Sequence, residues 1–422
     1  MEIFRIAQTD SGLTSHQIRE ALYESLNHKN IKKVLLVPPD FTRFHSNAGL
    51  ITNTYYHYLT ENKVMVDILP ALGTHVAMSR EECLEMYGDI PYEKFLYHNW
   101  RKDVVKLGKV PSEFVSEITE GLWDKEVIVE INKVIMDESY DLIISIGQVV
   151  PHEVIGMANH SKNLFVGCGG KDMINSSHMI GAVYGMEQMM GKDHTPVRKV
   201  LDYALEHYLA KRPILFVLTV TTAPNNKICT HGLFIGEHRK ALERAIALAQ
   251  EKNIYWLDKP IKKCIVYLDP KEFKSTWLGN KAIYRTRMAI ADGGELIVLA
   301  PGVVKFGEDL TVDKLIRKYG YLGRLKILEL FKNKRDLQQN MGMTAHLIHG
   351  SSDGRFKITY AVTHLTRAEI EKVNFTYASY DDIVKVYDPQ KLRYGWNTLA
   401  NNEEVYFIPN PALGLWIDKN RF

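Results

Sequence analysis

Short apolar runs rich in β-branched residues alternate with amphipathic segments along most of this 422-residue chain. Strands are expected at 32–38, 64–73, 142–147 and 214–222. Helices are expected at 47–61, 196–211 and 236–253, and a capping-box pattern at Ser79 and Glu82 predicts another helix start. Strands that alternate with helices usually form parallel sheets covered by helices, so the pattern predicts an α/β fold.

The alternation restarts after residues 254–263, which read as a junction. Further strands are expected at 263–269, 295–302 and 356–362, with a helix at 280–292 and two or three helices across 310–349. We therefore expect two α/β domains, 1–258 and 259–422, with mainly parallel sheets and an active-site cleft between them. Roughly the last 25 residues are expected to pack back on the N-terminal domain.

Composition excludes several classes of protein. Lys plus Arg is 53 and Asp plus Glu is 50, a net charge of +3, so we expect neither a nucleic acid nor a membrane surface as partner. No apolar run approaches the ~20 residues of a membrane span, and the first residues lack a signal-type segment. The four cysteines show no CxxC spacing, which disfavours disulfides and a cysteine zinc site. A cytoplasmic enzyme is the expectation.

Chemical groups follow the first predicted strand. Asp40, Thr42 and Arg43 lie in the loop Pro39-Asp-Phe-Thr-Arg43. Ligands of open α/β sheets gather at the carboxyl ends of strands, and an arginine fork suits an anion. The alternative is a turn with a local salt bridge.

Histidines follow two other strands. His75 ends Gly73-Thr74-His75, and His152 follows Pro151. A histidine at a strand end is a candidate acid or base, although it can also be a loop residue without a role. A polar stretch then contains Lys162, Gly169-Gly170-Lys171 and His178, but it matches neither a P-loop nor GxGxxG, which disfavours a standard ATP or NAD site.

The order Asp-x-Thr-Arg, Gly-Thr-His and Pro-His resembles the lactate racemase family. In that family a lysine follows the Pro-His histidine by ten positions, and a nickel-binding histidine follows the lysine by sixteen. Here His152 is followed by Lys162 and then by His178 at these spacings. The resemblance covers the whole predicted N-terminal domain.

The resemblance implies nickel and a nickel-pincer nucleotide, pyridinium-3,5-bisthiocarboxylic acid mononucleotide, as cofactors. Lys162 would carry the nucleotide through a thioamide, and His178 would bind nickel, for which imidazole is a suitable ligand. Asp40 and Thr42 would shape the neighbouring loop and contact the cofactor. Maturation proteins would be partners, because protein made without them lacks the cofactor.

The stretch before the lysine departs from the family pattern. The family usually has two glycines there, whereas this chain has Asn159 and His160. Lys171 follows Gly169-Gly170 and imitates that context, but it misses both spacings, so Lys162 is favoured as the tether and Lys171 is kept as a cofactor-binding candidate. His160 is a further group that could approach the metal.

The implied reaction is inversion at C2 of a 2-hydroxy acid by transient hydride transfer to the tethered nucleotide. His75 and His152 would be acid and base on opposite faces of the substrate, and Arg43 would bind its carboxylate. The activity would be that of an isomerase, a racemase or epimerase.

The predicted C-terminal domain indicates the substrate. The family has Tyr-Gln with a lysine three residues later; here Tyr284 is followed by Arg285, and Met288 replaces the lysine. Tyr284 and Arg285 are therefore the substrate-binding candidates, and a sugar acid or hydroxy-dicarboxylate is favoured over lactate. The alternative is that Arg285 and Arg287 lie on a solvated helix face.

Three other functions fit parts of the sequence. A nicotinamide-dependent 2-hydroxyacid dehydrogenase would use the same histidines, but the chain lacks GxGxxG. A non-catalytic two-lobed protein could bind a hydroxy acid without turnover. A zinc hydrolase would need a further ligand that the sequence does not mark.

Overall fold

The computed structural model describes residues 2–27, 29–224, 227–412 and 414–422. The chain forms two compact units. Unit 1 comprises Met1–Ile180 and Met189–Asn253, and unit 2 comprises Gly181–Gln188 and Ile254–Phe422. Relative to the expected boundary after residue 258, the segments 181–188 and 254–258 group with the C-terminal part. Whether these units correspond to separate domains stays a prediction.

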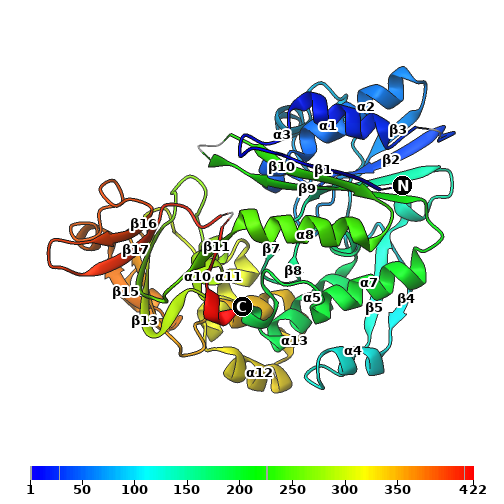
Figure 1. The fold of residues 1–422 in the computed structure, drawn as a ribbon. Helices are drawn as coiled ribbons and strands as arrows, with labels where there is room; N and C mark the ends of the chain where they lie inside the picture. Colours follow the sequence, from blue (N-terminus) through cyan, green and yellow to red (C-terminus); the bar gives the residue numbers. More distant parts are fainter. Residues whose placement is uncertain (1, 28, 225–226, 413) are drawn as a thin grey trace. The chain divides into compact units, whose positions relative to one another are not determined.

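A six-stranded sheet with the order β1-β10-β9-β6-β2-β3 forms the centre of unit 1 (Figure 1). Its strands are β1 (Glu2–Ile6), β2 (Lys33–Val37), β3 (Met65–Ile68), β6 (Leu142–Gln148), β9 (Ile214–Thr222) and β10 (Cys229–Gly236). Four strands run parallel, whereas β10 and β1 join antiparallel at one edge. The chain goes from β2 to β3 on one side and returns to β6 on the other. The loops after β2 and β6 therefore diverge, which is where such sheets bind ligands.

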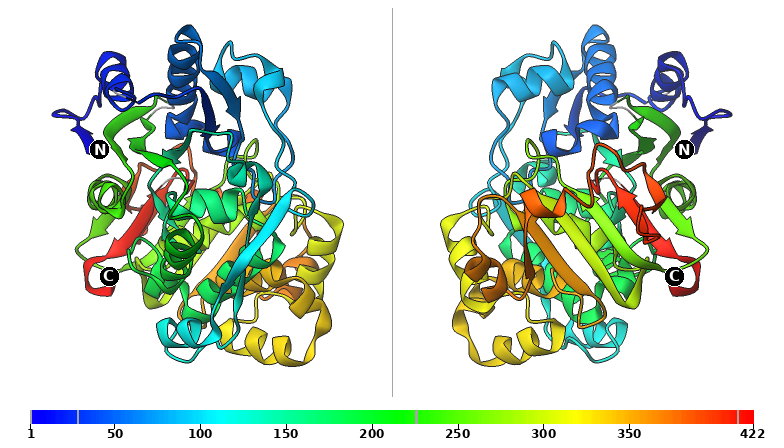
Figure 2. Two further views of the ribbon diagram at one scale, coloured as in Figure 1. Left: turned by 90° about the vertical axis from the view of Figure 1, so that its right-hand side faces the viewer. Right: turned by 90° about the vertical axis from the view of Figure 1, so that its left-hand side faces the viewer.

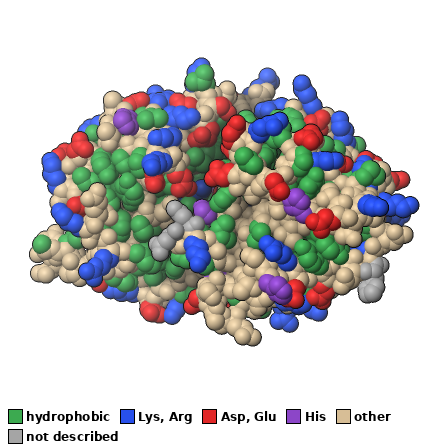
Figure 3. Space-filling view, turned by 90° about the horizontal axis from the view of Figure 1, so that it is seen from above, with side chains coloured by type: hydrophobic (Ala, Val, Ile, Leu, Met, Phe, Trp, Pro, Cys, Tyr) green, Lys and Arg blue, Asp and Glu red, His purple; other side chains and the backbone are tan. Residues whose placement is uncertain are grey.

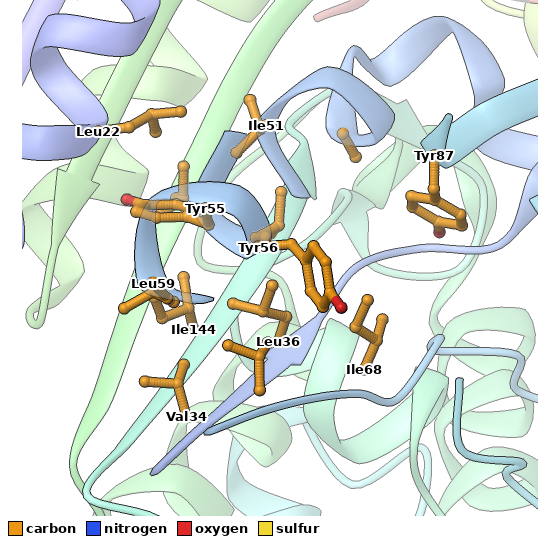
Figure 4. Close-up of a cluster of buried hydrophobic side chains, with 14 of the residues drawn as sticks. Leu22, Val34, Leu36, Ile51, Tyr55, Tyr56, Leu59, Ile68, Tyr87 and Ile144 are labelled. Atoms are coloured by element: carbon orange, nitrogen blue, oxygen red, sulfur yellow. The ribbon is translucent and has the colours of Figure 1, made fainter. Parts of the chain in front are cut away.

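Helices cover both faces of this sheet. In Figure 1, α1 (Ser15–Glu24) and α2 (Ala48–Glu61) lie on one face and α8 (Arg239–Asn253) on the other. Figure 4 shows how the core forms under α1 and α2. Apolar side chains of the two helices, such as Leu22 and Tyr55, meet every second residue of the central strands, such as Leu36 and Ile144. This burial supplies most of the stabilising free energy and holds the strand ends in place.

The remaining elements of unit 1 surround the sheet. They are α3 (Arg80–Tyr87), α4 (Ser112–Ile118), α7 (Pro196–Tyr208), the short helices η1 (Phe41–Ser46), η2 (Tyr92–Lys94) and η3 (Lys133–Met136), the π-helix η4 (Asn163–Gly167), and the pairs β4 (Val104–Val110) with β5 (Val127–Asn132) and β7 (Pro151–His152) with β8 (Gly156–Met157). The β4–β5 ribbon is the long cyan pair in the left view of Figure 2. Helix α5 (Lys171–Tyr184) begins in unit 1 and ends in unit 2. Helix α6 (Met186–Met189) begins in unit 2, and its last residue belongs to unit 1.

Unit 2 contains a second six-stranded sheet with the order β15-β14-β13-β12-β17-β16. Its strands are β12 (Ile261–Tyr267), β13 (Ile290–Ala300), β14 (Lys357–Val362), β15 (Thr376–Ser379), β16 (Gly395–Thr398) and β17 (Glu404–Ile408), of which only β16 pairs antiparallel. A separate parallel pair joins β11 (Ile254–Leu257) to β18 (Leu415–Asp418). The end of the chain thus pairs with the predicted junction, and both strands belong to unit 2.

Helices connect the strands of unit 2. They are α9 (Thr276–Gly279), α10 (Lys281–Thr286), α11 (Leu310–Tyr319), α12 (Arg324–Asn333), α13 (Arg335–Gln339), α14 (Met341–His349), α15 (Arg367–Lys372), α16 (Tyr380–Ile383) and η6 (Lys419–Arg421). No helix in the described part of the chain is long and apolar enough to cross a membrane. Figure 3 shows basic and acidic side chains interspersed on one face, in keeping with the small net charge.

The predicted α/β class with mainly parallel sheets is confirmed, but two details were wrong. The helix expected at 280–292 ends at Thr286, because the chain from Ile290 onward belongs to the long strand β13, which is buried from Leu296 to Ala300. The region 310–349 holds four helices, since Gly320, Gly323 and Asn340 interrupt it at backbone conformations that helices do not continue through. The junction 254–263 contains β11 and the start of β12.

Candidate active site

The loop after β2 places a buried carboxylate beside a histidine. Asp40 caps η1 and is 5% exposed, and its Oδ1 accepts hydrogen bonds from the Thr42 hydroxyl at 2.5 Å and the Thr42 N–H at 3.2 Å. Its Oδ2 lies 2.5 Å from Nδ1 of His75, which follows β3. The ionised carboxylate can only accept, so Nδ1–H donates and Nε2 becomes the basic nitrogen of neutral His75.

The charge on Asp40 is stable. Burial raises the pKa of Asp40, but the hydrogen bond and charge of His75, the Thr42 hydroxyl and the Arg43 guanidinium together lower it below its ordinary value. Asp40 is therefore ionised at neutral pH and orients His75, as a carboxylate commonly orients a catalytic imidazole.

His152 is held through the same ring atom by a different partner. It lies in β7, directly beyond β6, where it is buried, and the Val154 N–H donates to its Nδ1 at 3.1 Å. An accepting Nδ1 places the proton of neutral His152 on Nε2. Glu153 Oε2 is 4.0 Å from the same Nδ1, so a protonated His152 has a counter-charge beside it. Neutral His75 and neutral His152 are thus held as opposite tautomers.

Lys162 is the N-cap residue of η4 and lies shortly after an unusual pair of residues. Asn159 (φ 69°) and His160 (φ 59°) both have left-handed backbone conformations, which glycine adopts without strain. The Asn163 side chain donates to the Val37 carbonyl and the Ser145 hydroxyl, both at 3.0 Å, which ties this segment to β2 and β6. The two positions at which the resemblance led us to expect glycine thus have backbone conformations that glycine favours, although neither residue is glycine.

The amine of Lys162 is half-buried and electrostatically unusual. Burial, and then the charge of Arg43, lower its pKa from 10.5 to about 8, with the carboxylates of Glu153 and Asp40 opposing the effect. An appreciable fraction of the amine is therefore neutral and nucleophilic near pH 7 to 8. Lys171, by contrast, is an exposed residue at the start of α5.

His178 lies on α5 and is also held through Nδ1. Nδ1–H donates to the Ile174 carbonyl at 2.6 Å, one turn earlier in the helix. Burial lowers the pKa of His178, the Ile174 hydrogen bond partly offsets this, and the Lys162 charge lowers it further. A neutral imidazole with its proton on Nδ1 has a lone pair on Nε2, the arrangement that metal-binding histidines use. The described residues contain no group of three or more His, Cys, Asp or Glu placed to hold a metal by themselves.

His160 was a further metal candidate, and its surroundings do not support that role. Its ring stacks on Phe216 with centroids 3.9 Å apart, and it is 2% exposed. Burial and the charges of Arg198 and Arg239 keep its pKa well below the ordinary value. Among the described residues, the charges that act on His160 are those of Arg198 and Arg239, whereas the charge of Lys162 acts on His178.

Tyr284 and Arg285 lie on α10 in unit 2, and both are buried. The alternative of a solvated helix face is wrong, because Arg285 is 3% and Arg287 4% exposed. Arg287 pairs with Glu187 at 3.0 Å and Asp353 at 3.3 Å, so it is a structural residue of unit 2. The Tyr284 hydroxyl lies 2.8 Å from Nδ1 of His346.

Sequence reasoning missed two groups. Glu153 interacts electrostatically with Lys162 and His178, and its place next to His152 in the sequence was the available signal. His346 contacts Tyr284 from 62 residues further along the chain, and the sequence assigned it no role of its own.

Comparison with known proteins agrees with this arrangement. Residues 10–191 match the family model "Lactate racemase N-terminal domain". The N-terminal region is therefore similar to the N-terminal domain of lactate racemases. This similarity suggests an isomerase of the 2-hydroxyacid racemase type. No curated protein sequence matches the chain.

Two solved structures share the fold over almost the whole chain. A crystal structure of a Thermotoga maritima protein has a TM-score of 0.80 and 24% identity, covering 98% of this chain and all of that one. The lactate racemase apoprotein from Thermoanaerobacterium thermosaccharolyticum has a TM-score of 0.72 and 17% identity, covering 96% and 93%. The lactate racemase fold therefore includes both units of this chain.

Within unit 1, the structure brings the lactate racemase-type residues together. Asp40, Thr42 and His75 share hydrogen bonds. The charge of Arg43 lowers the pKa of Lys162, and the charge of Lys162 lowers the pKa of His178. His152 lies beyond the neighbouring strand β6, while Lys171 is exposed and takes no part in these interactions among the described contacts. Tyr284 and Arg285 form their own buried group in unit 2.

Proposed function

We propose that this protein is a racemase or epimerase that inverts C2 of a 2-hydroxy acid. One observation carries the proposal: His75, His152 and His178 are each fixed through Nδ1 by a protein group, so that Nε2 is the nitrogen that acts. Two of these histidines follow strands of one sheet at its ligand-binding edge, where acid/base catalysis needs them.

The two catalytic histidines would share the proton transfers. Nε2 of neutral His75 takes the proton of the substrate hydroxyl, while Asp40 stabilises the resulting imidazolium through Nδ1–H. For the opposite isomer, protonated His152, with Glu153 beside it, donates Nε2–H to the substrate oxygen. After one turnover their protonation states are exchanged. The proton that stays on His152 would then be on Nδ1, where Glu153 would have to replace the Val154 N–H as its partner. Arg43 would bind the carboxylate of the substrate through its guanidinium fork.

The residues present also fit the nickel-pincer nucleotide. Lys162 has an amine that is partly neutral near pH 8, as formation of a thioamide requires, and His178 has an oriented imidazole. Asp40 and Thr42 would contact the cofactor beside Arg43, and Lys171 is the second, less favoured tether. When bound, the cofactor would supply the acceptor for the C2 hydride; the protein orients the substrate and moves its protons.

The proposed substrate is more polar than lactate. Arg285 adds a buried cation next to Tyr284, where the family pattern has a glutamine. A sugar acid or a hydroxy-dicarboxylate would offer the additional polar groups that such a pair recognises.

Intact mass and peptide mapping test the cofactor part of this proposal. The protein is produced together with the maturation proteins of the nickel-pincer nucleotide, which are its proposed partners. We expect an adduct on Lys162 that is absent in K162A and retained in K171A. H178A is expected to keep the adduct but lose nickel. An adduct on Lys171 would overturn the tether assignment, and no adduct where a known lactate racemase is loaded would overturn the proposal.

Substrate turnover tests the catalytic part. We expect loaded H75A and H152A each to lose turnover by at least ~10²-fold while keeping the adduct and the fold. Near-normal activity in either variant would exclude the two-histidine mechanism. Release of NADH from a hydroxy acid would instead indicate a dehydrogenase.

A further inference from the structure

A buried chain of hydrogen bonds connects Tyr284 to three other elements of unit 2. Its hydroxyl lies 2.8 Å from Nδ1 of His346 on α14, and Nε2 of His346 lies 3.0 Å from the Tyr321 hydroxyl. The Tyr321 hydroxyl lies 2.9 Å from Oγ1 of Thr276, which is 3.1 Å from the Phe306 carbonyl. Tyr284, Tyr321 and His346 are each 6% exposed or less, and Thr276 is fully buried.

The hydrogen bond to the Phe306 carbonyl determines which group is the donor in each of the other hydrogen bonds. A carbonyl can only accept, so Thr276 gives its single hydroxyl proton to Phe306; otherwise two oxygens would face each other with lone pairs at 3.1 Å. Thr276 must then accept from Tyr321, and Tyr321 must accept from Nε2–H of His346. Neutral His346 therefore has its lone pair on Nδ1, and the Tyr284 hydroxyl donates its proton there.

The ring of His346 is well placed to impose this direction. It stacks on Trp277 with centroids 4.1 Å apart and an interplanar angle of 26°. The rings of Tyr284 and Tyr321 approach it edge-on, at 6.3 Å and 5.5 Å between centroids. Packing on three sides restricts rotation of the imidazole, so the two nitrogens keep their different partners.

We propose that His346 is a positioning residue that makes Tyr284 a hydrogen-bond acceptor toward the substrate. This inference rests on the proposed function, in which Tyr284 and Arg285 bind the substrate. A hydroxyl group of the substrate can donate to the Tyr284 oxygen, whereas a carboxylate there would place two acceptors against each other. The structure thus assigns a polyhydroxy acid, with one hydroxyl that donates to Tyr284 and another whose oxygen accepts from Arg285, in preference to a hydroxy-dicarboxylate.

The tautomer of His346 can be measured without cofactor or substrate. In protein labelled with 15N-histidine, the His346 signals are identified by their loss in H346N. We expect a protonated Nε2 and an unprotonated Nδ1 at a pH where the ring is neutral. A protonated Nδ1 would overturn the inference, and this result does not depend on whether the enzyme is a racemase.

Matched variants of the loaded enzyme test the substrate preference. The Asn side chain of H346N places an amide oxygen near the position of Nδ1 and keeps an acceptor for Tyr284, whereas the longer H346Q reaches the position of Nε2 and does not. The measured quantity is the ratio of kcat/KM for a polyhydroxy acid to that for a hydroxy-dicarboxylate. We expect Y284F and H346Q to reduce this ratio by ~10-fold or more, and H346N to stay within about threefold of wild type.

The outcomes separate this inference from the proposed function. Wild-type preference for the dicarboxylate, or equal ratios in H346N and H346Q, would overturn the role of His346 and leave the racemase proposal intact. Failure to turn over any 2-hydroxy acid, in protein with the Lys162 adduct, would overturn the proposed function and the substrate assignment together.

Discussion

Lys162 is the single residue whose surroundings change its chemistry most. Burial and the charge of Arg43 lower its pKa from 10.5 to about 8. Between these two pH values the unfolded chain binds more protons than the folded protein, so stability rises with pH from about 8 to 10.5. Below this range the folded protein holds a half-buried charge at a cost to its stability.

Replacing Lys162 with methionine should therefore stabilise the cofactor-free protein. We expect K162M to raise the free energy of unfolding at pH 7 by roughly 1–2 kcal/mol, a value discounted for the partial exposure of the amine. The gain should fade as pH rises toward 10.5. Urea unfolding at several pH values measures it, with the exposed K171M as a control expected to change by less than about 0.5 kcal/mol. A destabilised K162M would contradict this account of the lysine.

The ionised form of Asp40 stabilises the folded protein, whereas the charged form of Lys162 destabilises it. Its pKa is lowered in the folded state, so it stabilises the protein above the ordinary value of 3.8, and this contribution is lost as pH falls through its folded pKa. We expect D40N to cost roughly 1–3 kcal/mol at pH 7, because hydrogen bonds from His75 and Thr42 to the charge are weakened. The difference between D40N and wild type should shrink below pH 3.8 in denaturation experiments. An unchanged difference there would exclude the ionised carboxylate as its cause.

At the scale of elements, the turn before η4 shows how the backbone conformation of two residues positions a side chain of the candidate site. Asn159 and His160 hold left-handed conformations in succession, and the Asn159 side chain accepts the His160 N–H at 2.7 Å. This local hydrogen bond helps asparagine to replace glycine at such a position. The turn places Lys162 at the start of η4.

Two substitutions at Asn159 separate conformation from side-chain contact. We expect N159A to lower the free energy of unfolding by ~1–2 kcal/mol, because alanine lacks both the permissive backbone and the local hydrogen bond. N159G should stay within about 0.5 kcal/mol of wild type, since glycine adopts φ 69° freely. Thermal or urea unfolding measures both variants. Equal losses in the two would show that the side chain, and not the backbone conformation, matters.

Helix α15 offers a test of local electrostatics in unit 2. Glu369 completes a capping box with Thr366 and pairs with Arg317 at 2.8 Å, and these contacts lower its pKa from 4.5 to about 2. We expect E369Q to cost about 1 kcal/mol at neutral pH. Because the folded pKa is depressed, the stabilisation is present above pH 4.5 and should disappear as pH falls toward 2. A loss independent of pH would point to the cap alone.

Many of the helices and strands could be predicted from the sequence. The pattern Ser79 to Glu82 identified the start of α3, and the apolar runs located the parallel strands, because these signals are local. The direction of the imidazole rings could not be predicted, since it depends on which backbone groups, such as the Val154 N–H, meet each nitrogen. Arg285 and Arg287 were equally ambiguous, because burial of a charge depends on distant partners such as Glu187.

At the scale of the whole molecule, unit 2 is discontinuous in sequence. The segment Gly181–Gln188 groups with residues more than 60 positions further along the chain. Glu187 accepts from Arg287 at 3.0 Å and Arg355 at 2.5 Å, and Arg287 is almost completely buried. A short insertion into unit 1 is thus held in unit 2 by ion pairs.

Removing the charge of Glu187 should weaken unit 2 as a whole. We expect E187Q to lower the free energy of unfolding by roughly 2–4 kcal/mol, because Arg287 then remains buried with Asp353 as its charged partner. E206Q, at an exposed position on α7, is the control and should be nearly neutral. Fluorescence-detected unfolding measures both. A loss in E187Q no larger than that in E206Q would show that these ion pairs are dispensable.

The left-handed pair before Lys162 has a consequence for the way related enzymes are recognised in genomes. A search pattern written as two glycines before the tethering lysine rejects this chain at both positions. A requirement for two successive residues with left-handed backbone conformations accepts it, because Asn159 and His160 both have such conformations. Distantly related proteins are therefore better identified by the backbone conformation of this turn than by its amino-acid sequence.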